Sequence, residues 1–195
     1  GTNAYGQSLF TSVTPSELTP NEAYFQHIDW VINRAEELGL HVVAFTAWRG
    51  YWMTEKEPGA IMTPTNAQKF DQFLGNRYKD RESIVWALGG DGSPTPGAPT
   101  YANDVATINA LAGGLTAGGS TPLKSYHPGG NKSSSTTAFS SWLDVNMVQS
   151  GHGSPNTNAA IWNTLIGGAT GDWNKTPTKP VIDAEPIYED IQTPL

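Results

Sequence analysis

Two acidic residues of this sequence lie where apolar segments end. Asp91 closes the run 83–91 after a pair of glycines, and Glu185 lies near the end of the run 179–186, just before a proline. If both runs are strands of one parallel sheet, both carboxylates lie at carboxyl-terminal strand ends, where barrel enzymes place their chemistry. Two carboxylates facing each other across a barrel mouth are what glycoside hydrolysis needs. The spacing indicates that reaction as the hypothesis to test.

Each carboxylate also has a structural interpretation. Trp86 lies in the same run as Asp91, and an apolar wall beside a carboxyl group disfavours its charged form, which suits a general acid. The local sequence alone favours the alternative, an Asp that caps the next turn by accepting hydrogen bonds from backbone amides. Glu185 and Asp183 share one face of the predicted strand, and the longer Glu185 is better placed to reach a ligand. Asp183 is either a rival catalytic group or a carboxylate held by a neighbour.

Two histidines, His127 and His152, also lie at predicted strand ends. No paired-histidine spacing typical of a metal site is present, so neither a metal nor another cofactor is predicted. Binding of sugar hydroxyls, orientation of a carboxylate, or a purely structural role fits each histidine. Ser150 lies in a segment without the glycine pattern of a serine hydrolase, which leaves a serine esterase as a less favoured alternative.

Aromatic residues are abundant, with seven Trp and seven Tyr. Trp48, Trp52 and Trp142 lie at or near predicted strand ends. Aromatic faces pack well on the C–H surfaces of sugars, although ordinary core filling accounts for most aromatic side chains. Trp48 is the aromatic residue that we place in a substrate site.

The composition limits the partners. A chain of 195 residues is long enough for one domain over 1–195, but short for a (β/α)₈ barrel of about 250 residues. The net charge of −7 gives no basic footprint for nucleic acid or an anionic membrane surface, and no apolar run is long enough for a membrane helix. With no cysteine, disulfides and thiol nucleophiles are excluded. The expected partner is an oligosaccharide or polysaccharide substrate.

Helical and strand patterns alternate along the chain. Thr19 is the predicted cap of a first helix with Pro20 in its first turn, and Thr63 caps a second helix. A third helical face begins at Tyr101, and a fourth helix is expected around 158–166. Strands are predicted at 41–48, 83–91, 123–127, 143–150 and around 181.

This alternation predicts a parallel α/β fold with right-handed crossovers. No glycine-rich phosphate fingerprint follows a first strand, so a TIM-type barrel is favoured over a doubly wound sheet. About five of eight strands are visible, and another chain or a further segment is expected to complete the barrel. The loops 93–97 and 129–137 either shape a pocket or are solvated linkers.

Four motifs occur in the order found in the apiosidase-like glycoside hydrolases, which include glycoside hydrolase family 140. They are Trp86-Ala87-Leu88-Gly89-Gly90-Asp91, Tyr126-His127-Pro128-Gly129-Gly130, Asn146-Met147-Val148-Gln149-Ser150-Gly151-His152 and the segment 179–189. The resemblance covers nearly the whole chain. It implies a TIM-barrel catalytic domain of which strands three to seven lie in this sequence, the first two strands before it and the last one after it.

The resemblance also implies roles for single residues. Asp91 would be the acid/base and Glu185 the nucleophile of a retaining mechanism. The sugar site would be lined by His127, Asn146, Gln149, His152 and Tyr188. The implied substrate is a pectic glycan of the plant cell wall, with apiose as the sugar released, and this implies secretion or a periplasmic location. The alternative is a catalytically incompetent barrel fragment that serves as a sugar-binding or scaffold module.

Overall fold

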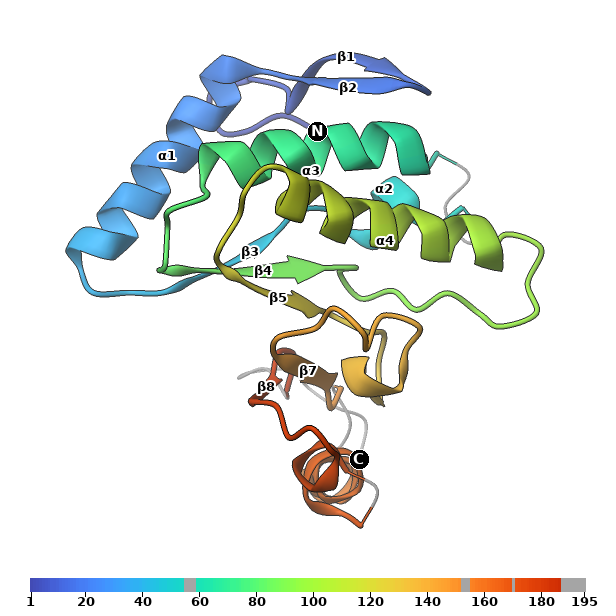
Figure 1. Cartoon of the computed structure of the whole chain (residues 1–195). Helices are drawn as coiled ribbons and strands as arrows, with labels where there is room; N and C mark the ends of the chain where they lie inside the picture. The colour runs from blue at the N-terminus through green and yellow to red at the C-terminus, as the bar shows by residue number, and fades with distance from the viewer. Residues whose placement is uncertain (55–58, 152–154, 170, 187–195) are drawn as a thin grey trace.

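The computed structural model describes residues 1–54, 59–151, 155–169 and 171–186. Its centre is a set of parallel strands, with three long helices covering one side of the strands at the N-terminal end of the set (Figure 1). Within the described residues, no helix is both long and apolar enough to cross a membrane.

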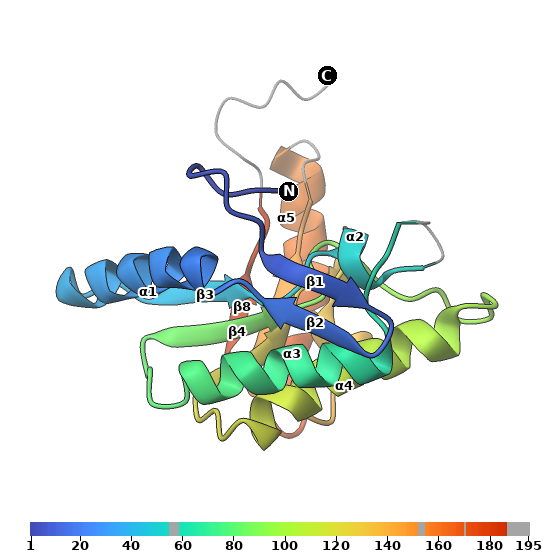
Figure 2. The ribbon, with the colours of Figure 1, turned by 90° about the horizontal axis from the view of Figure 1, so that it is seen from above.

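The chain begins with an antiparallel hairpin that the sequence patterns did not predict. Strands β1 (Phe10–Thr14) and β2 (Glu17–Pro20) pair with each other and lie across helix α3, as Figure 2 shows from above. Thr19 is therefore not a helix cap, because it is a strand residue paired with Ser12. The cap of α1 (Glu22–Glu37) is Asn21, whose side chain accepts a hydrogen bond from the backbone of Ala23.

The first sheet consists of three parallel strands connected through helices. Its order is β3-β4-β5, and each strand lies beside its predecessor in the sequence. The strands are β3 (Val42–Phe45), β4 (Ile84–Leu88) and β5 (Leu123–Tyr126). The connecting helices are α2 (Arg49–Trp52), α3 (Pro64–Arg77) and α4 (Tyr101–Ala117). All three strands are shorter than the apolar runs that predicted them.

Helices α3 and α4 bury the faces that the sequence pattern predicts. The Thr63 side chain accepts a hydrogen bond from the backbone of Asn66, and the Asn66 side chain accepts one from the backbone of Thr63, which caps α3 at the predicted residue. Most of the expected core positions are at most 5% exposed, whereas Tyr101 and Val105 are only partly buried; the buried ones are Ala67, Phe70, Leu74, Tyr78, Ile108, Ala112 and Leu115. These side chains form the core between the helices and the sheet.

The C-terminal half adds a second sheet of order β6-β7-β8. Strands β7 (Asn146–Gln149) and β8 (Val181–Asp183) are parallel, and the short β6 (Lys132–Ser133) is antiparallel to β7. Between them lie helix α5 (Pro155–Trp162), the π-helical turn η2 (Asn163–Gly167) and the 3₁₀ turn η3 (Asp172–Asn174). A further 3₁₀ turn, η1 (Ser134–Thr136), follows β6.

The Ser/Thr-rich run 129–137 is ordered structure rather than a solvated linker. Ser133 and Ser134 are buried, and the Ser133 hydroxyl donates to Asp172 Oδ2 at 2.5 Å. The Ser134 hydroxyl accepts a hydrogen bond from the backbone N–H of Met147 at 3.0 Å. The short polar side chains are thus used to satisfy buried backbone and carboxylate groups.

The two sheets adjoin through β5 and the residues that precede β7. The backbone N–H of Asp144 donates to the carbonyl of Lys124 at 2.9 Å, and the Ser125 hydroxyl donates to the carbonyl of Val145 at 2.8 Å. The parallel strands therefore follow one another in space in their sequence order, β3, β4, β5, β7 and β8, as the descending ribbon in Figure 1 shows. The fold is mixed α/β, as the alternating pattern predicts.

Candidate active site

A tight left-handed turn after β4 positions Asp91. Gly89, Gly90 and Asp91 have φ angles of 97°, 58° and 55°, and only the two glycines adopt this region without steric cost. Surrounding groups hold the turn in place. The indole N–H of Trp52 donates to the Gly89 carbonyl at 2.7 Å, and the backbone N–H of Arg49 donates to the Gly90 carbonyl at 3.2 Å. A non-glycine residue in such a conformation marks a functional-site candidate.

His127 directly follows β5 and contacts this turn. Its Nδ1 accepts a hydrogen bond from the backbone N–H of Asp91 at 3.1 Å, and its own backbone N–H donates to the Leu88 carbonyl at 2.7 Å. Because Nδ1 is an acceptor, the neutral imidazole carries its proton on Nε2. The tautomer is thus set by the turn that holds Asp91.

Glu185 lies on the other side of the same imidazole. Its Oε2 accepts a hydrogen bond from the Gln149 side-chain amide at 2.7 Å and lies 3.4 Å from His127 Nε2. The Glu185 carbonyl accepts from the backbone N–H of Gly151 at 3.2 Å, which fixes the chain beyond β8 against the end of β7. The Glu185 side chain is 13% exposed, so this carboxylate is largely enclosed.

One histidine ring therefore lies between the two predicted catalytic residues. His127 is 2% exposed, and burial lowers the pKa of its imidazole, while the nearby carboxylates of Glu185 and Asp91 act in the opposite direction. A neutral imidazole with its proton on Nε2 is a hydrogen-bond donor directed at Glu185. The structure brings Asp91, His127, Gln149 and Glu185 together.

Arg49 is a site residue that the sequence patterns did not reveal. It opens α2 one residue after Trp48, and its guanidinium lies 3.1 Å from Asp91 Oδ2. The expected apolar wall from Trp86 is not there, because the Trp86 indole donates to the Ser120 hydroxyl at 2.8 Å and packs near Tyr78. Arg49 directly follows the predicted strand 41–48, and a basic residue at a strand end is the sequence signal that could have identified it.

Trp48 supplies an aromatic surface beside the histidine. Its ring centroid lies 6.0 Å from that of His127, and the two planes make an angle of 40°. A Cβ atom at Gly90 would lie 2.6 Å from the Trp48 ring, so the glycine allows the turn to pass close to the indole. Trp48 is 44% exposed, which leaves part of its face open to a ligand.

Asp183 is held by a neighbour. The Ser150 hydroxyl donates to Asp183 Oδ2 at 2.7 Å, and the Ser150 backbone N–H lies 3.4 Å from Asp183 Oδ1. This is the structural alternative for Asp183 rather than the catalytic one. The Ser150 hydroxyl therefore donates to a carboxylate. A serine nucleophile would instead donate to a histidine, and no such bond is present among the described residues.

A family model for the apiosidase-like catalytic domain matches residues 1–195. The chain belongs to this apiosidase-like family. A glycoside hydrolase family 5 protein from Bacteroides vulgatus ATCC 8482 is 31% identical, with a TM-score of 0.75, over 98% of this chain and 41% of that chain. A second solved structure, a glycoside hydrolase, has the same identity and TM-score over 98% of this chain and 43% of its own.

The family assignment confirms the resemblance seen in the motifs. This chain spans about two fifths of the length of the two solved glycoside hydrolases. No curated protein gives a significant match.

Not every predicted sugar-site residue joins the cluster around His127. Asn146 begins β7, at the opposite end from Gln149, and lines a separate cavity with Ser135 and Lys175. His152 and Tyr188 lie outside the described residues. The predicted roles of these last two residues stay predictions.

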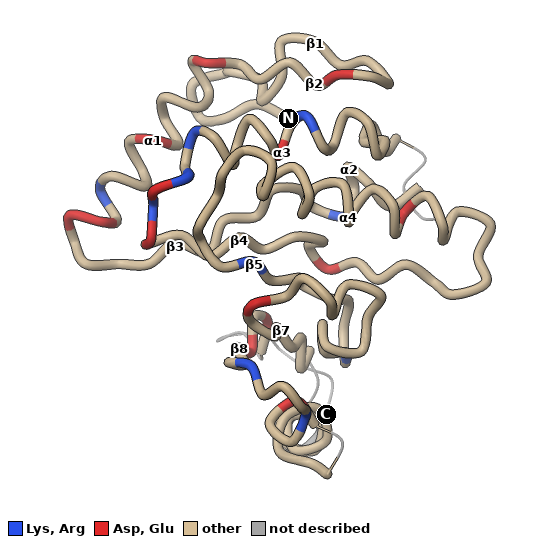
Figure 3. Tube along the Cα trace, viewed as in Figure 1, with Lys and Arg blue, Asp and Glu red and all other residues tan. Residues whose placement is uncertain are grey.

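A polar cavity of about 190 Å³ opens beside Asp91. Two of its lining residues, Arg49 and Lys132, are basic. The whole sequence has only 11 Lys and Arg residues, and Figure 3 shows that they are spread along the chain. The rest of the lining comes from Met53, Asp91, Gly92, Ser93, Thr95, Gly129 and Gly130. Among the described residues, no group of three or more His, Asp or Glu side chains could hold a metal ion.

Proposed function

We propose that the domain hydrolyses a glycosidic bond by a retaining two-carboxylate mechanism, with Asp91 as acid/base and Glu185 as nucleophile. The observation that carries the proposal is the position of His127, which touches the backbone of Asp91 with one ring nitrogen and approaches the carboxylate of Glu185 with the other. Both residues thus lie next to His127 beyond the carboxyl ends of their strands, where catalytic groups of barrel enzymes lie.

The contacts of each carboxylate support the division of roles. Glu185 accepts a hydrogen bond from the Gln149 amide and lies beside Nε2 of His127, contacts that hold the proposed nucleophile in place. Asp91 is 30% exposed on its side chain and borders the open cavity, where a leaving group can meet it. The general acid must carry a proton in the first step, so the Arg49 contact must loosen when substrate binds.

Retention requires a short separation of the two carboxyl groups. Retaining glycosidases hold them about 5–5.5 Å apart, whereas inverting enzymes leave about 6.5–9.5 Å for a water molecule. The His127 ring contacts the backbone N–H of Asp91 and the carboxylate of Glu185, so the two residues are neighbours across one ring, and retention is our proposal for this pair. Asp91 would protonate the leaving oxygen while Glu185 attacks the anomeric carbon, and Asp91 would then activate the water that releases the sugar.

The substrate class that we propose is an acidic pectic glycan bearing apiose. The apiosidase-like family supports apiose as the sugar. The presence of two basic residues, Arg49 and Lys132, in one polar cavity supports an anionic polymer as the substrate. The exposed face of Trp48 beside His127 provides a stacking surface for a sugar ring. Because a cell-wall polymer lies outside the cell that degrades it, we propose that the protein is secreted or periplasmic.

The order of the parallel strands supports a barrel as the complete fold. We assign β3, β4, β5, β7 and β8 to consecutive positions of a (β/α)₈ barrel, because each lies beside its predecessor and the connections run through helices or turns. Further strands from a longer protein or from another chain would close the ring.

Substitution of each carboxylate separates the two roles. Glu185→Ala should abolish hydrolysis of an aryl apioside, and sodium azide should restore turnover with a glycosyl azide of inverted configuration as product. Asp91→Ala should slow hydrolysis of the natural glycan about 10²–10⁴-fold but affect an aryl glycoside with a good leaving group much less. Proton NMR of the first product should show retention.

The matched control is Glu17→Ala, at the exposed first position of strand β2, which should leave the rate unchanged. Near-normal turnover of either carboxylate variant would remove that residue from its role. An initial product of opposite anomeric configuration would replace the retaining mechanism with an inverting one. Glycan binding without hydrolysis by the unaltered protein would favour the non-catalytic sugar-binding module.

A further inference from the structure

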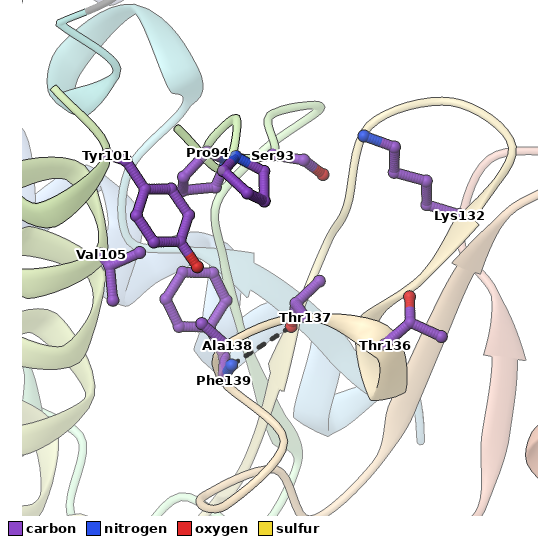
Figure 4. A pocket seen from close by; sticks show the side chains of 10 residues that line it. Ser93, Pro94, Tyr101, Val105, Lys132, Thr136, Thr137, Ala138 and Phe139 are labelled. Atoms are coloured by element: carbon purple, nitrogen blue, oxygen red, sulfur yellow. Dashed lines mark hydrogen bonds between the residues drawn. The ribbon is translucent and has the colours of Figure 1, made fainter. Parts of the chain in front are cut away.

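A second cavity continues the one beside Asp91. It has a volume of about 280 Å³ and is shown in Figure 4. Its lining residues are Ser93, Pro94, Pro96, Tyr101, Val105, Lys132, Thr136, Thr137, Ala138 and Phe139. Ser93 and Lys132 line both cavities, so the two spaces meet at these residues. Together they form a path that begins at Asp91 and ends at the start of α4.

The walls of this path are held by defined contacts. The Ser93 hydroxyl accepts a hydrogen bond from the backbone N–H of Gly129 at 3.0 Å, which ties the loop after β4 to the loop after β5. The backbone of Lys132 pairs with Gln149 of β7, so the position of this residue is set by the same strand that orients Glu185. The path is therefore built on the elements that form the candidate active site.

The surface of the second cavity combines apolar and polar groups. Tyr101, Val105 and Phe139 give it an aromatic and aliphatic side, while Thr136, Thr137 and Lys132 give it a polar side (Figure 4). In the part of the chain that the structure describes, neither the Tyr101 hydroxyl nor the Lys132 ammonium has a hydrogen-bond or ion-pair partner. A ligand with both C–H faces and hydroxyl groups fits such a surface, and a sugar has both.

We infer that the second cavity is a further sugar subsite on the leaving-group side of the scissile bond. The inference rests on the proposed function, because the direction comes from the role of Asp91. The acid protonates the oxygen of the departing group, so the departing group lies against the acid and away from the nucleophile. The two cavities lead away from Asp91, so they would hold the leaving group. The first cavity would take the first sugar unit of the leaving group and the second cavity the next one.

The substrate that this arrangement selects is an oligosaccharide with at least two sugar units on the leaving-group side. Tyr101 is the stacking residue for the second unit, and Lys132 binds polar groups of the glycan at the junction of the two cavities. Binding energy from this distant unit would help to place the scissile bond for reaction.

The test compares two pectic oligosaccharides that share the apiosyl bond and differ by one sugar on the leaving-group side. The longer one should have a kcat/KM at least about tenfold higher, and Tyr101→Ala should reduce that ratio to near one. Lys132→Met should lower the ratio as well. Tyr5→Ala and Lys69→Met, at exposed positions of the first loop and of α3, should leave the ratio unchanged.

Equal kcat/KM values for the two oligosaccharides, or a ratio unchanged by Tyr101→Ala, would overturn the subsite. Calorimetric titration of the Glu185→Gln variant with the longer oligosaccharide gives a readout without turnover. Weaker binding after Tyr101→Ala in that background supports the subsite. If the unaltered protein hydrolyses neither compound, the proposed hydrolase is rejected, while the binding result still decides the subsite. Binding that does not depend on Tyr101 rejects the subsite.

Discussion

At the scale of single residues, the candidate site depends on how Glu185 is held. The Gln149 amide donates to its Oε2 at 2.7 Å, and His127 Nε2 lies 3.4 Å from the same oxygen. Gln149 is 4% exposed and comes from β7, the strand beside the one that leads to Glu185. We therefore regard Gln149 as a positioning residue for the nucleophile.

Gln149→Ala should lower kcat with little change in KM. A hydrogen bond to a charged group contributes about 1.5–3 kcal/mol, and a loss of that size in the transition state corresponds to roughly a ten- to hundredfold lower rate. Steady-state kinetics on the oligosaccharide substrate measures both constants. Gln68→Ala, at an exposed position of α3, is the matched control. A variant that raises KM at unchanged kcat would contradict the positioning role.

Asp71 on α3 is a buried carboxylate outside the candidate active site. It is 0% exposed and neither carboxylate oxygen has a hydrogen-bond partner among the described residues. Burial raises the pKa of this carboxyl well above its usual range, and the nearby Thr46 hydroxyl acts weakly in the opposite direction. The folded protein therefore keeps a proton that the unfolded chain releases near pH 4.

The contribution of Asp71 to stability should consequently fall as the pH rises above about 4, because this group then binds fewer protons in the unfolded state than in the folded state. Asp71→Asn removes the ionisable group, so its free energy of unfolding relative to the unaltered protein should increase from pH 4 to pH 7. Urea unfolding across this range measures the difference, with exposed Asp80→Asn as the control. A difference that stays constant with pH would show that Asp71 is ionised in the folded state.

At the scale of elements, helices α3 and α4 pack at glycines. A Cβ atom at Gly114 would lie 2.4 Å from the backbone oxygen of Gln68, and one at Gly118 would lie 2.4 Å from that of Gln72. The absence of side chains lets the two helix backbones approach each other closely. The two helices cover the sheet that contains β4, and Asp91 follows β4 in the chain (Figure 1).

Gly114→Ala should destabilise the protein by at least about 1–3 kcal/mol, since the added methyl group overpacks the helix interface. Gly113→Ala is the matched control, because nothing lies within 4 Å of a Cβ atom at that neighbouring position. The control should gain up to about 1 kcal/mol from the higher helix propensity of alanine. Thermal and urea unfolding measure both effects. Equal stability of the two variants would contradict the close packing.

At the scale of the whole molecule, the parallel strands form an open set. In the described residues, β3 pairs with β4 alone and β8 pairs with β7 alone. The β3 residues Val43 and Phe45 are 44% and 40% exposed. An unpaired strand edge with exposed apolar side chains is a template for pairing with further strands.

The 195-residue chain should therefore self-associate as its concentration rises, and Val43→Lys should suppress the association because a charged side chain blunts a strand edge. Light scattering after size-exclusion chromatography measures the mass. Val31→Lys, on α1 at a similar exposure of 40%, changes charge and hydropathy without altering a strand edge. Suppression by both variants alike would point to general hydrophobic association instead.

Sequence patterns alone predicted the long helices, the parallel strands and the family, and they singled out Asp91 and Glu185 as candidates whose catalytic roles stay predictions. These features depend on local periodicity, on capping at Thr63 and on motifs contiguous in the chain, so they are legible without coordinates. The hairpin β1–β2 was missed because its strand residues are mostly exposed and carry little apolar alternation.

The residues that surround the two carboxylates became known from the three-dimensional structure. It set Arg49 against Asp91, removed Trp86 from that neighbourhood and placed Asn146 in another cavity. The contacts Arg49–Asp91, Asp91–His127 and Gln149–Glu185 join residues 36 to 42 positions apart, and they depend on the left-handed turn at Asp91 and on strand register. A shift of one residue in a strand reverses which face a side chain occupies, so periodicity places residues on elements but does not choose their partners.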